Sequence, residues 1–179
     1  LVFIEDTRSL SQKLEERIER LAMIMPELEA MHNILPLKPK VKFYEGFAGM
    51  KEVYLDMLKT CQPGDEILEF GGFRNVYEML TPEFVKYYIS ERVKKKIRIR
   101  LIAPKGPEAV QLQKESAGIL REVKLFDEKQ YQFQSYLGIY KNKIALISYA
   151  ENFMAVIIES KQLSDMQRVA FEIIWQSLS

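Results

Sequence analysis

The sequence predicts an α/β protein in which helices flank a mixed β-sheet, preceded by a separate N-terminal helix. Three observations support this prediction. Helical and strand patterns alternate from about residue 41 to about residue 120, as in parallel β-α-β units. A mostly antiparallel run of strands and one last helix follow, which makes the sheet mixed. The 179 residues are 47% hydrophobic and 28% charged, which is ordinary for a domain with a buried core.

The first predicted element is a helix from residue 7 to about residue 31. Its apolar residues recur at spacings of four, three, four and three, the a/d seam of a heptad repeat, with charges of both signs beside it. Pro26 should kink or restart the helix because its ring clashes with the preceding turn. The seam predicts a two-stranded coiled coil. About two heptads are too short to hold a dimer alone, and a helix packed on its own domain is the alternative. The seam residues are Leu14, Ile18, Leu21, Met25 and Leu28.

A proline-containing linker separates this helix from the globular part. Pro36 and Pro39 favour extended backbone and end any helix, so the globular domain should begin near Pro39. We therefore expect a coiled-coil dimerisation helix with its linker at residues 1–37 and an effector-binding α/β domain at residues 38–179.

The first half of that domain alternates strands with amphipathic helices. Glycines end the first two strands, and Thr81 should cap the second helix, with Pro82 in its first position. Lysines at the C-terminal end of that helix complement its dipole. The predicted elements are a strand at 41–45, a helix at 49–61, a strand at 66–70, a helix from Pro82 to about Lys96 and a strand from Ile97 that ends at Pro104.

The second half contains the antiparallel part of the sheet. A proline opens its first helix, and a two-residue turn at 141–142 indicates a hairpin. The predicted elements are a helix from Pro107 to about Leu120, a strand at 123–126, hairpin strands at 133–140 and 143–148, a strand at 153–159 and a final helix capped by Ser160 or Ser164.

Composition excludes several classes of protein. The net charge of +1 provides no general attraction for nucleic acid or anionic membrane, and no apolar run reaches the roughly 18 residues of a membrane helix. Cys61 is the only cysteine, so no intrachain disulfide can form, which suits the cytoplasm. His32, the only histidine, lies in the linker region, away from any expected pocket. We expect no metal and no cofactor, and the first residue, Leu1, suggests a fragment of a longer protein.

A ligand site is predicted at the carboxyl ends of the parallel strands, where open α/β sheets bind ligands. Glycines there let a ligand approach the backbone, and Glu45 and Arg74 would provide charge. The alternative is that the glycines only provide a tight exit from a strand. The candidate residues at this edge are Glu45, Gly46, Gly71, Gly72 and Arg74.

Three other groups of residues are expected to be structural. The basic cluster of 94–96 with Arg98 and Arg100 fits a solvated helix end better than a phosphate contact. Cys61 should be a buried thiol whose pKa is raised at the helix C-terminus. Six tyrosines could line a pocket, but at strand and helix spacing most of them should lie in or beside the core, namely Tyr87, Tyr88, Tyr131, Tyr136, Tyr140 and Tyr149.

From about Glu27 onward, the chain resembles the C-terminal region of TrmB-family transcription regulators. The matching stretches are framework patterns and not catalytic signatures: PEL at 26–28, PKVKFYEG at 39–46, AVIIESK at 155–161 and AFEIIW at 170–175. In that family a winged helix-turn-helix precedes a dimerising coiled coil and an effector domain resembling phospholipase D, and known members bind sugars. The resemblance implies a homodimer that binds a sugar-like small molecule, and that reaches DNA only through an N-terminal domain missing from this sequence.

Phospholipase D enzymes use a His-x-Lys motif with the histidine as nucleophile, and the corresponding strand here offers Gln132 and Gln134. Glutamine can hydrogen-bond but cannot attack phosphorus or transfer protons near pH 7. We therefore expect a phospholipase D-like fold without enzymatic activity, in which Gln132 and Gln134 join the candidate ligand-binding residues.

The sequence thus predicts the effector-sensing and dimerisation region of a DNA-binding transcription regulator, acting in the cytoplasm without a membrane partner. Two alternatives belong to other classes. One is a divergent phospholipase D-like phosphodiesterase, and the other is a protein-interaction module that binds no ligand.

Overall fold

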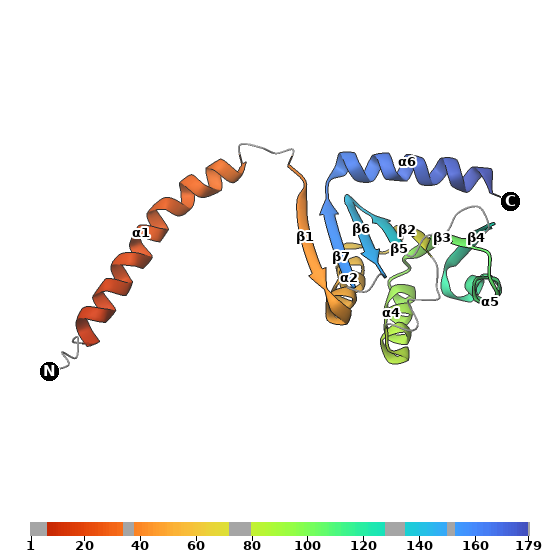
Figure 1. Ribbon diagram of the computed structural model, residues 1–179, viewed down its shortest axis with the longest axis horizontal. Helices are drawn as coiled ribbons and strands as arrows, with labels where there is room; N and C mark the ends of the chain where they lie inside the picture. Colours follow the sequence, from red (N-terminus) through yellow and green to blue (C-terminus); the bar gives the residue numbers. More distant parts are fainter. Residues whose placement is uncertain (1–6, 34–37, 72–79, 128–134, 150–152, 179) are drawn as a thin grey trace. The chain divides into compact units, whose positions relative to one another are not determined.

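The computed structural model describes residues 7–33, 38–71, 80–127, 135–149 and 153–178. The chain divides into two compact units, residues 1–38 and 39–179, which are described separately (Figure 1). Within the described residues, no helix is long and apolar enough to cross a membrane. Gly72, Arg74, Gln132 and Gln134, four of the predicted site residues, lie outside the described residues.

The first unit contains one helix, α1 (Thr7–Asn33). The helix continues through Pro26, so the predicted restart there is wrong: proline removes one backbone hydrogen bond, and the helix tolerates that loss. Leu28 belongs to α1, although its side chain is outside the described part. The other four seam residues are between 47% and 63% exposed in the single chain, namely Leu14, Ile18, Leu21 and Met25.

The second unit contains the predicted elements with small shifts at their ends. Thr81 accepts a hydrogen bond from the Phe84 N–H and caps its helix as predicted. Ser160, and not Ser164, caps the last helix. The strands are β1 (Lys40–Glu45), β2 (Glu66–Gly71), β3 (Arg98–Pro104), β4 (Arg121–Phe126), β5 (Ser135–Tyr140), β6 (Lys143–Ser148) and β7 (Met154–Glu159). The helices are α2 (Gly46–Thr60), α4 (Pro82–Lys94), α5 (Pro107–Glu115), the 3-10 helix η1 (Ser116–Ile119) and α6 (Lys161–Ser177).

The described strands form one mixed sheet in the order β1-β7-β6-β5-β2-β3-β4. The strands β2, β3 and β4 are parallel, whereas β1, β7, β6, β5 and β2 alternate in direction. The β1-α2-β2 stretch therefore does not form neighbouring parallel strands, because β7, β6 and β5 lie between β1 and β2. The mixed α/β class predicted from the sequence is confirmed.

Helices cover the two faces of the sheet unequally. In Figure 1, α6 lies on one side of the sheet, and α2, α4 and α5 lie on the other. The larger core, which includes Val53 of α2, Ile99 of β3 and Tyr88 of α4, forms on the three-helix side. The smaller core joins Leu68, Ile102 and Ile139 of the sheet to two aromatic residues of α6.

Arg100 of β3 holds α6 on the sheet. Its guanidinium donates two hydrogen bonds to the Glu172 carboxylate and one, of 2.8 Å, to Glu66. It also lies 5.3 Å from the ring centroids of Phe171 and Trp175. The sequence placed Arg100 in a solvated basic cluster. The structure instead shows Arg100 hydrogen-bonded to Glu172 and Glu66. The sequence did not indicate the Glu172 contact, because α6 lies far along the chain from β3.

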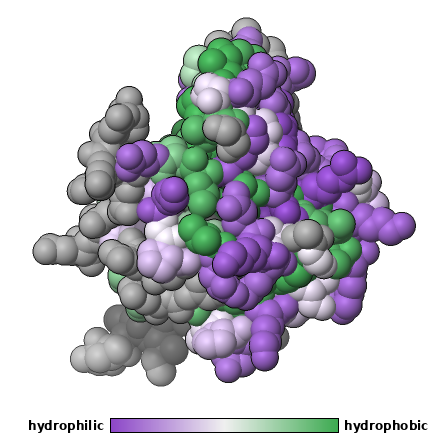
Figure 2. All heavy atoms as spheres, turned by 90° about the vertical axis from the view of Figure 1, so that its right-hand side faces the viewer, coloured by the Kyte–Doolittle hydropathy of each residue, from purple (hydrophilic) through white to green (hydrophobic). Residues whose placement is uncertain are grey.

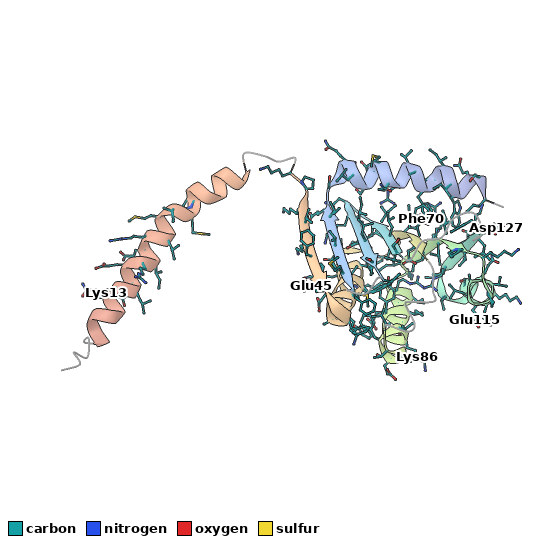
Figure 3. All side chains as sticks on the ribbon, viewed as in Figure 1. Lys13, Glu45, Phe70, Lys86, Glu115 and Asp127 are labelled. Carbon is teal, nitrogen blue, oxygen red and sulfur yellow. The ribbon has the colours of Figure 1, made fainter. Side chains whose placement is uncertain are left out.

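The rest of the α6 contact is apolar or involves the helix end. Phe70 packs edge-on against Phe171 with ring centroids 5.0 Å apart, and Figure 3 shows it between the sheet and α6. Lys124 of β4 donates to the carbonyls of Trp175 and Leu178 at 3.0 and 2.6 Å. These are among the last carbonyls of the helix, which have no partner within it.

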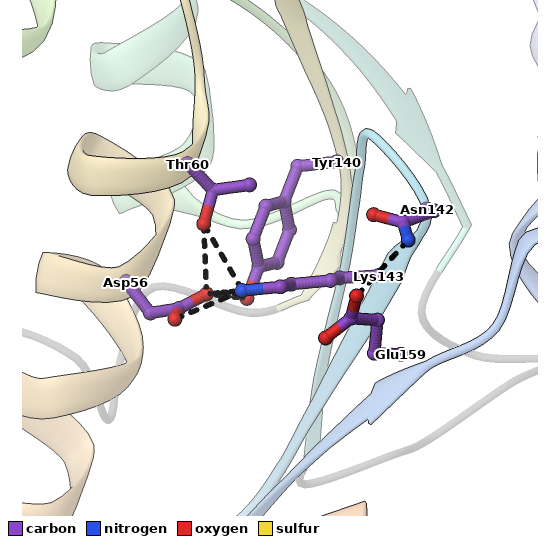
Figure 4. Close-up of polar contacts among 6 residues, drawn as sticks. All are labelled: Asp56, Thr60, Tyr140, Asn142, Lys143 and Glu159. Atoms are coloured by element: carbon purple, nitrogen blue, oxygen red, sulfur yellow. Dashed lines mark hydrogen bonds and ion pairs between the residues drawn. The ribbon is translucent and has the colours of Figure 1, made fainter. Parts of the chain in front are cut away.

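On the other face, a polar cluster joins α2 to the β5–β6 hairpin (Figure 4). The Lys143 ammonium donates to both carboxylate oxygens of Asp56, at 3.0 and 2.8 Å, and to the Thr60 hydroxyl at 3.1 Å. The Tyr140 hydroxyl also donates to Asp56, at 2.8 Å. Burial by itself would raise the pKa of Asp56, but the hydrogen bonds from Lys143 and Tyr140 outweigh it and hold that pKa below its ordinary value.

Lys143→Met should destabilise the protein by about 1–3 kcal/mol at pH 7, because it leaves the partly buried Asp56 carboxylate without its cation. The folded-state pKa of Asp56 is lowered, so its contribution is present above the unfolded-state pKa and is lost as pH falls through the folded-state value. Urea denaturation of both proteins should show their difference shrinking in acid. Lys94→Met, which breaks an exposed pair with Glu91, is the control. Equal effects of the two substitutions on stability would contradict a stabilising role of the Lys143–Asp56 ion pair.

Candidate functional site

The predicted ligand edge exists as one end of the sheet, but its residues are spread along it. Glu45 and Gly71 are the last residues of β1 and β2, and both strands end on the same side. Glu45 is exposed and lies at the end of β1 in Figure 3, whereas Gly71 is buried. Four strand spacings separate the two strands, or about 19 Å. A single small ligand could therefore contact either Glu45 or Gly71 but not both.

The two described glycines at this edge each have a structural role. Gly71 faces the Tyr136 ring so closely that a Cβ there would lie 3.2 Å from the Tyr136 Cδ2 atom. Gly46 has a φ of 65°, a conformation that favours glycine. Its N–H donates a 2.8 Å hydrogen bond to the Phe153 carbonyl, which ties the end of β1 to the residue before β7.

Directly below this edge lies a buried polar cluster that the sequence analysis missed. We define the Glu69 cluster as Glu69 of β2 with four tyrosines on the three-helix side of the sheet. The Tyr136 hydroxyl donates a 3.0 Å hydrogen bond to the Glu69 carboxylate. Both the Tyr136 and the Tyr88 hydroxyls also lie 3.8 Å from the Met57 sulfur. The tyrosines are Tyr54, Tyr88, Tyr136 and Tyr149.

The rings of the Glu69 cluster pack against one another. Tyr54 meets Tyr88 edge-on, with centroids 5.1 Å apart, and Tyr136 at 5.9 Å. The Tyr149 hydroxyl forms no hydrogen bond of ordinary geometry to the described residues, and it interacts electrostatically with Tyr54 and Glu69. Four of the six tyrosines named in the sequence analysis are buried, as predicted: Tyr88, Tyr136, Tyr140 and Tyr149. Tyr87 is 51% exposed, and Tyr131 lies outside the described residues.

Burial dominates the electrostatics of this cluster. It raises the pKa of Glu69, and the charge of Arg121, the Tyr136 hydrogen bond and the charge of Arg92 offset only part of that effect. Burial likewise raises the pKa of Tyr54 and of Tyr136, so both keep their hydroxyl protons. The cluster can donate and accept hydrogen bonds, and its carboxyl group is the one that changes protonation most readily.

Arg92 places a buried cation near Glu69. Its side chain is fully buried and donates to the carbonyls of Ile97, Ile119 and Leu120. These carbonyls lie where α4 leads into β3 and where η1 ends at Leu120, whose φ is 54°. The left-handed Leu120 ends the helical stretch of α5 and η1, while Arg92 satisfies the carbonyls there.

Two sequence features could have revealed the Glu69 cluster. Glu69 interrupts the otherwise apolar core of the strand Ile67–Phe70, and a charged residue inside a buried strand is unusual. Tyr136 and Tyr88 stand at core positions of their own elements. No local pattern, however, connects these three residues before β5 is known to pair with β2.

The remaining candidates for chemistry are consistent with structural roles. Cys61 is buried, as predicted, and burial followed by the charge of Asp65 raises the pKa of its thiol to about 11. Among the described residues, no three His, Cys, Asp or Glu side chains lie close enough together to hold a metal ion. His32 belongs to α1, in the other unit.

Comparison with solved structures defines the class of fold. No protein-family model and no curated protein sequence matches the chain. Nuc, a phospholipase D family member from Salmonella typhimurium, aligns with a TM-score of 0.60 and 11% identity over 79% of this chain and 97% of its own. NucT from Helicobacter pylori aligns with a TM-score of 0.52 and 10% identity over 79% and 98%. The second unit therefore has a phospholipase D-like fold, and identities this low show the fold alone.

A third structure aligns over more of the chain. TrmBL2, an archaeal chromatin protein described as binding DNA by a novel mode, aligns with a TM-score of 0.52 and 16% identity. The alignment covers 96% of this chain and 66% of TrmBL2, so the chain spans less than two thirds of that protein.

The comparisons overturn one prediction. The sequence analysis expected a protein without enzymatic activity, from the glutamines at 132 and 134. The sheet is instead shared with a phospholipase D family member and with NucT, so the fold is one that carries phosphodiester chemistry. The two glutamines lie outside the described residues, and the loss of a histidine at one position was not sufficient ground for that prediction.

The raised pKa of Glu69 gives a pH-dependent prediction. A carboxyl group with a raised folded-state pKa stabilises the fold below its unfolded-state pKa, and this advantage is lost as pH rises through the folded-state value. Glu69→Gln keeps an acceptor for Tyr136 but cannot ionise. Denaturation from acid to neutral pH should therefore show wild type losing stability relative to Glu69→Gln.

Tyr136→Phe tests the cause of this effect. It removes the hydrogen bond that lowers the pKa of Glu69, so the loss of stability should continue to higher pH than in wild type. A wild-type protein that gains stability over Glu69→Gln as pH rises would contradict a raised pKa of Glu69.

Proposed function

We propose that this chain is the dimerisation and effector-binding region of a DNA-binding regulator related to the TrmB family. The proposal is supported by one observation above the others: the TrmBL2 alignment reaches beyond the sheet. The two phospholipase D-like alignments cover 79% of the chain, the share that residues 39–179 make of the total. An alignment over 96% must also include most of α1, so the similarity to TrmBL2 extends over both units of this chain.

Dimerisation is assigned to the seam of α1. Four of its residues are at least 47% exposed in the single chain, and they follow a heptad spacing. If the same stripe of a second copy covered this stripe, both would be removed from water. Charges of both signs lie beside the seam, which permits the same surface of two copies to meet. The seam is short, so the second unit must contribute to the dimer as well.

The effector is assigned to the edge where β1 ends. Glu45 is exposed there, and β1 is the first strand after α1 in the chain. A small molecule bound at Glu45 would therefore act on the strand that α1 leads into. Only a difference in its affinity for two dimer arrangements would change the regulator's state.

Contact with DNA is assigned to a part of the full-length protein beyond these 179 residues. The share of TrmBL2 that the chain does not cover is consistent with this assignment. The net charge of +1 also provides little electrostatic attraction for DNA from the present residues. A regulator of this kind would act in the cytoplasm.

Ile18→Glu should disrupt the dimer. A carboxylate at this seam position would be buried against its copy, so the dimer dissociation constant should rise at least tenfold. Sedimentation equilibrium over a range of protein concentrations measures it. Gln12→Glu adds the same charge off the seam and is the matched control. A wild-type chain that remains monomeric at high micromolar concentration would contradict the proposal.

Glu45→Gln should weaken effector binding. Calorimetric titration with a panel of neutral mono- and disaccharides should find at least one that binds the wild type, and the variant should bind it at least tenfold more weakly. Glu52→Gln, on the exposed side of α2, is the control. Hydrolysis of bis(4-nitrophenyl) phosphate is followed in parallel. Turnover without saccharide binding would favour the alternative function, a divergent phosphodiesterase.

A further inference from the structure

One half of the sheet has an apolar surface that the described elements leave exposed. Phe43 of β1, Val156 of β7 and Leu146 of β6 form a continuous row on the α6 side, since Phe43 pairs with Val156 and Val156 with Leu146. Phe43 is 78% exposed and Leu146 40% exposed. The same row continues to Leu137, which packs against the smaller core under α6. The row is therefore buried at one end and exposed at the other.

The outer side of α6 has a second exposed apolar stripe. Met166, Val169 and Ile173 follow helical spacing on the side away from the buried Phe171, and they are 57%, 60% and 65% exposed. The helix thus has a buried stripe against the sheet and a second apolar stripe facing outward. Figure 2 shows hydrophobic and hydrophilic residues both reaching the surface at the end of the molecule where α6 terminates. We define the open face as Val41, Phe43, Leu146, Met154, Met166, Val169, Ile173 and Ile174.

We propose that the open face is a second dimer contact, covered by the same face of a second copy of this chain. The inference rests on the proposed function, because it names a second contact of the dimer assigned there. The two contacts lie in different units, so each can be tested by itself.

The size of the open face supports a protein partner. Its eight residues are between 40% and 78% exposed, which at roughly 200 Å² for a large side chain amounts to on the order of 800 Å². A stable interface buries about 800 Å² on each partner, so the open face provides enough area for one.

The charges along α6 favour a second copy over a charged partner. Lys161 is paired with Asp165, and Arg100 with Glu172, so the ionic groups of this border cancel. A two-fold axis places a patch against itself, which a patch of one sign would oppose and a balanced patch permits. A membrane surface would instead require an excess of cations beside the apolar residues.

The test is sedimentation equilibrium of the full chain and of two variants, Ile173→Glu on α6 and Phe43→Glu on β1. Both positions are more than 60% exposed, so the fold should be retained, and thermal denaturation checks it. Each variant should raise the dimer dissociation constant at least tenfold. Ser90→Glu adds the same charge to an exposed position of α4, on the opposite layer, and should leave the constant unchanged.

The outcomes separate this inference from the proposed function. If Ile18→Glu weakens the dimer and neither open-face variant does, the open face is not a dimer contact and the inference is overturned. If the open-face variants weaken it and Ile18→Glu does not, the inference is supported and the coiled-coil assignment fails. A monomeric wild type overturns both. Weakening by Ser90→Glu to the same extent would attribute the effect to added charge and also overturn the inference.

Discussion

The alternation of side chains along the seven-stranded sheet is the constraint on which the rest of the structure depends. Successive residues of a strand point to opposite faces, so one pairing register decides which face each residue occupies. In β2, Glu69 points into the three-helix layer, whereas Leu68 and Phe70 point toward α6. In β1, the same alternation places Phe43 on the α6 side of the sheet and Tyr44 on the other side. The Glu69 cluster and the open face are both consequences of this single register.

The two faces are stabilised by different means. On one side the helices α2, α4 and α5 enclose a large apolar core, which can include a buried carboxyl group because hydroxyl and guanidinium groups surround it. On the other side α6 covers the sheet, held by the ion pair of Arg100 of β3 with Glu172 and by the hydrogen bonds from Lys124 of β4 to backbone carbonyls. These contacts lie far from β1, which explains why α6 does not cover the edge at β1.

The fold itself does not select one function. The same sheet occurs in a phospholipase D family member and in a chromatin protein that binds DNA. What distinguishes the chromatin protein in this comparison is an alignment that extends over α1. The functional proposal therefore depends on the combination of helix and sheet, since function is carried by sites and attached elements more than by a fold.

The amino-acid sequence by itself determined which stretches of the chain form helices and which form strands. Thr81 and Ser160 cap their helices as the local pattern predicts, and Cys61 is buried on the apolar side of α2, because caps and helical periodicity depend only on residues a few positions apart. The heptad spacing of α1 was equally visible, although α1 continues through Pro26 without a restart.

Only the tertiary structure decided which strands are neighbours. It placed β1 beside β7, brought Tyr136 to Glu69 and set Arg100 against Glu172, contacts between residues about 70 or more positions apart. It also separated Glu45 from Gly71, which the sequence analysis had assigned to one ligand site. Such pairings follow from the packing of whole layers. A pattern that repeats every two or four residues does not indicate which distant residues it will contact.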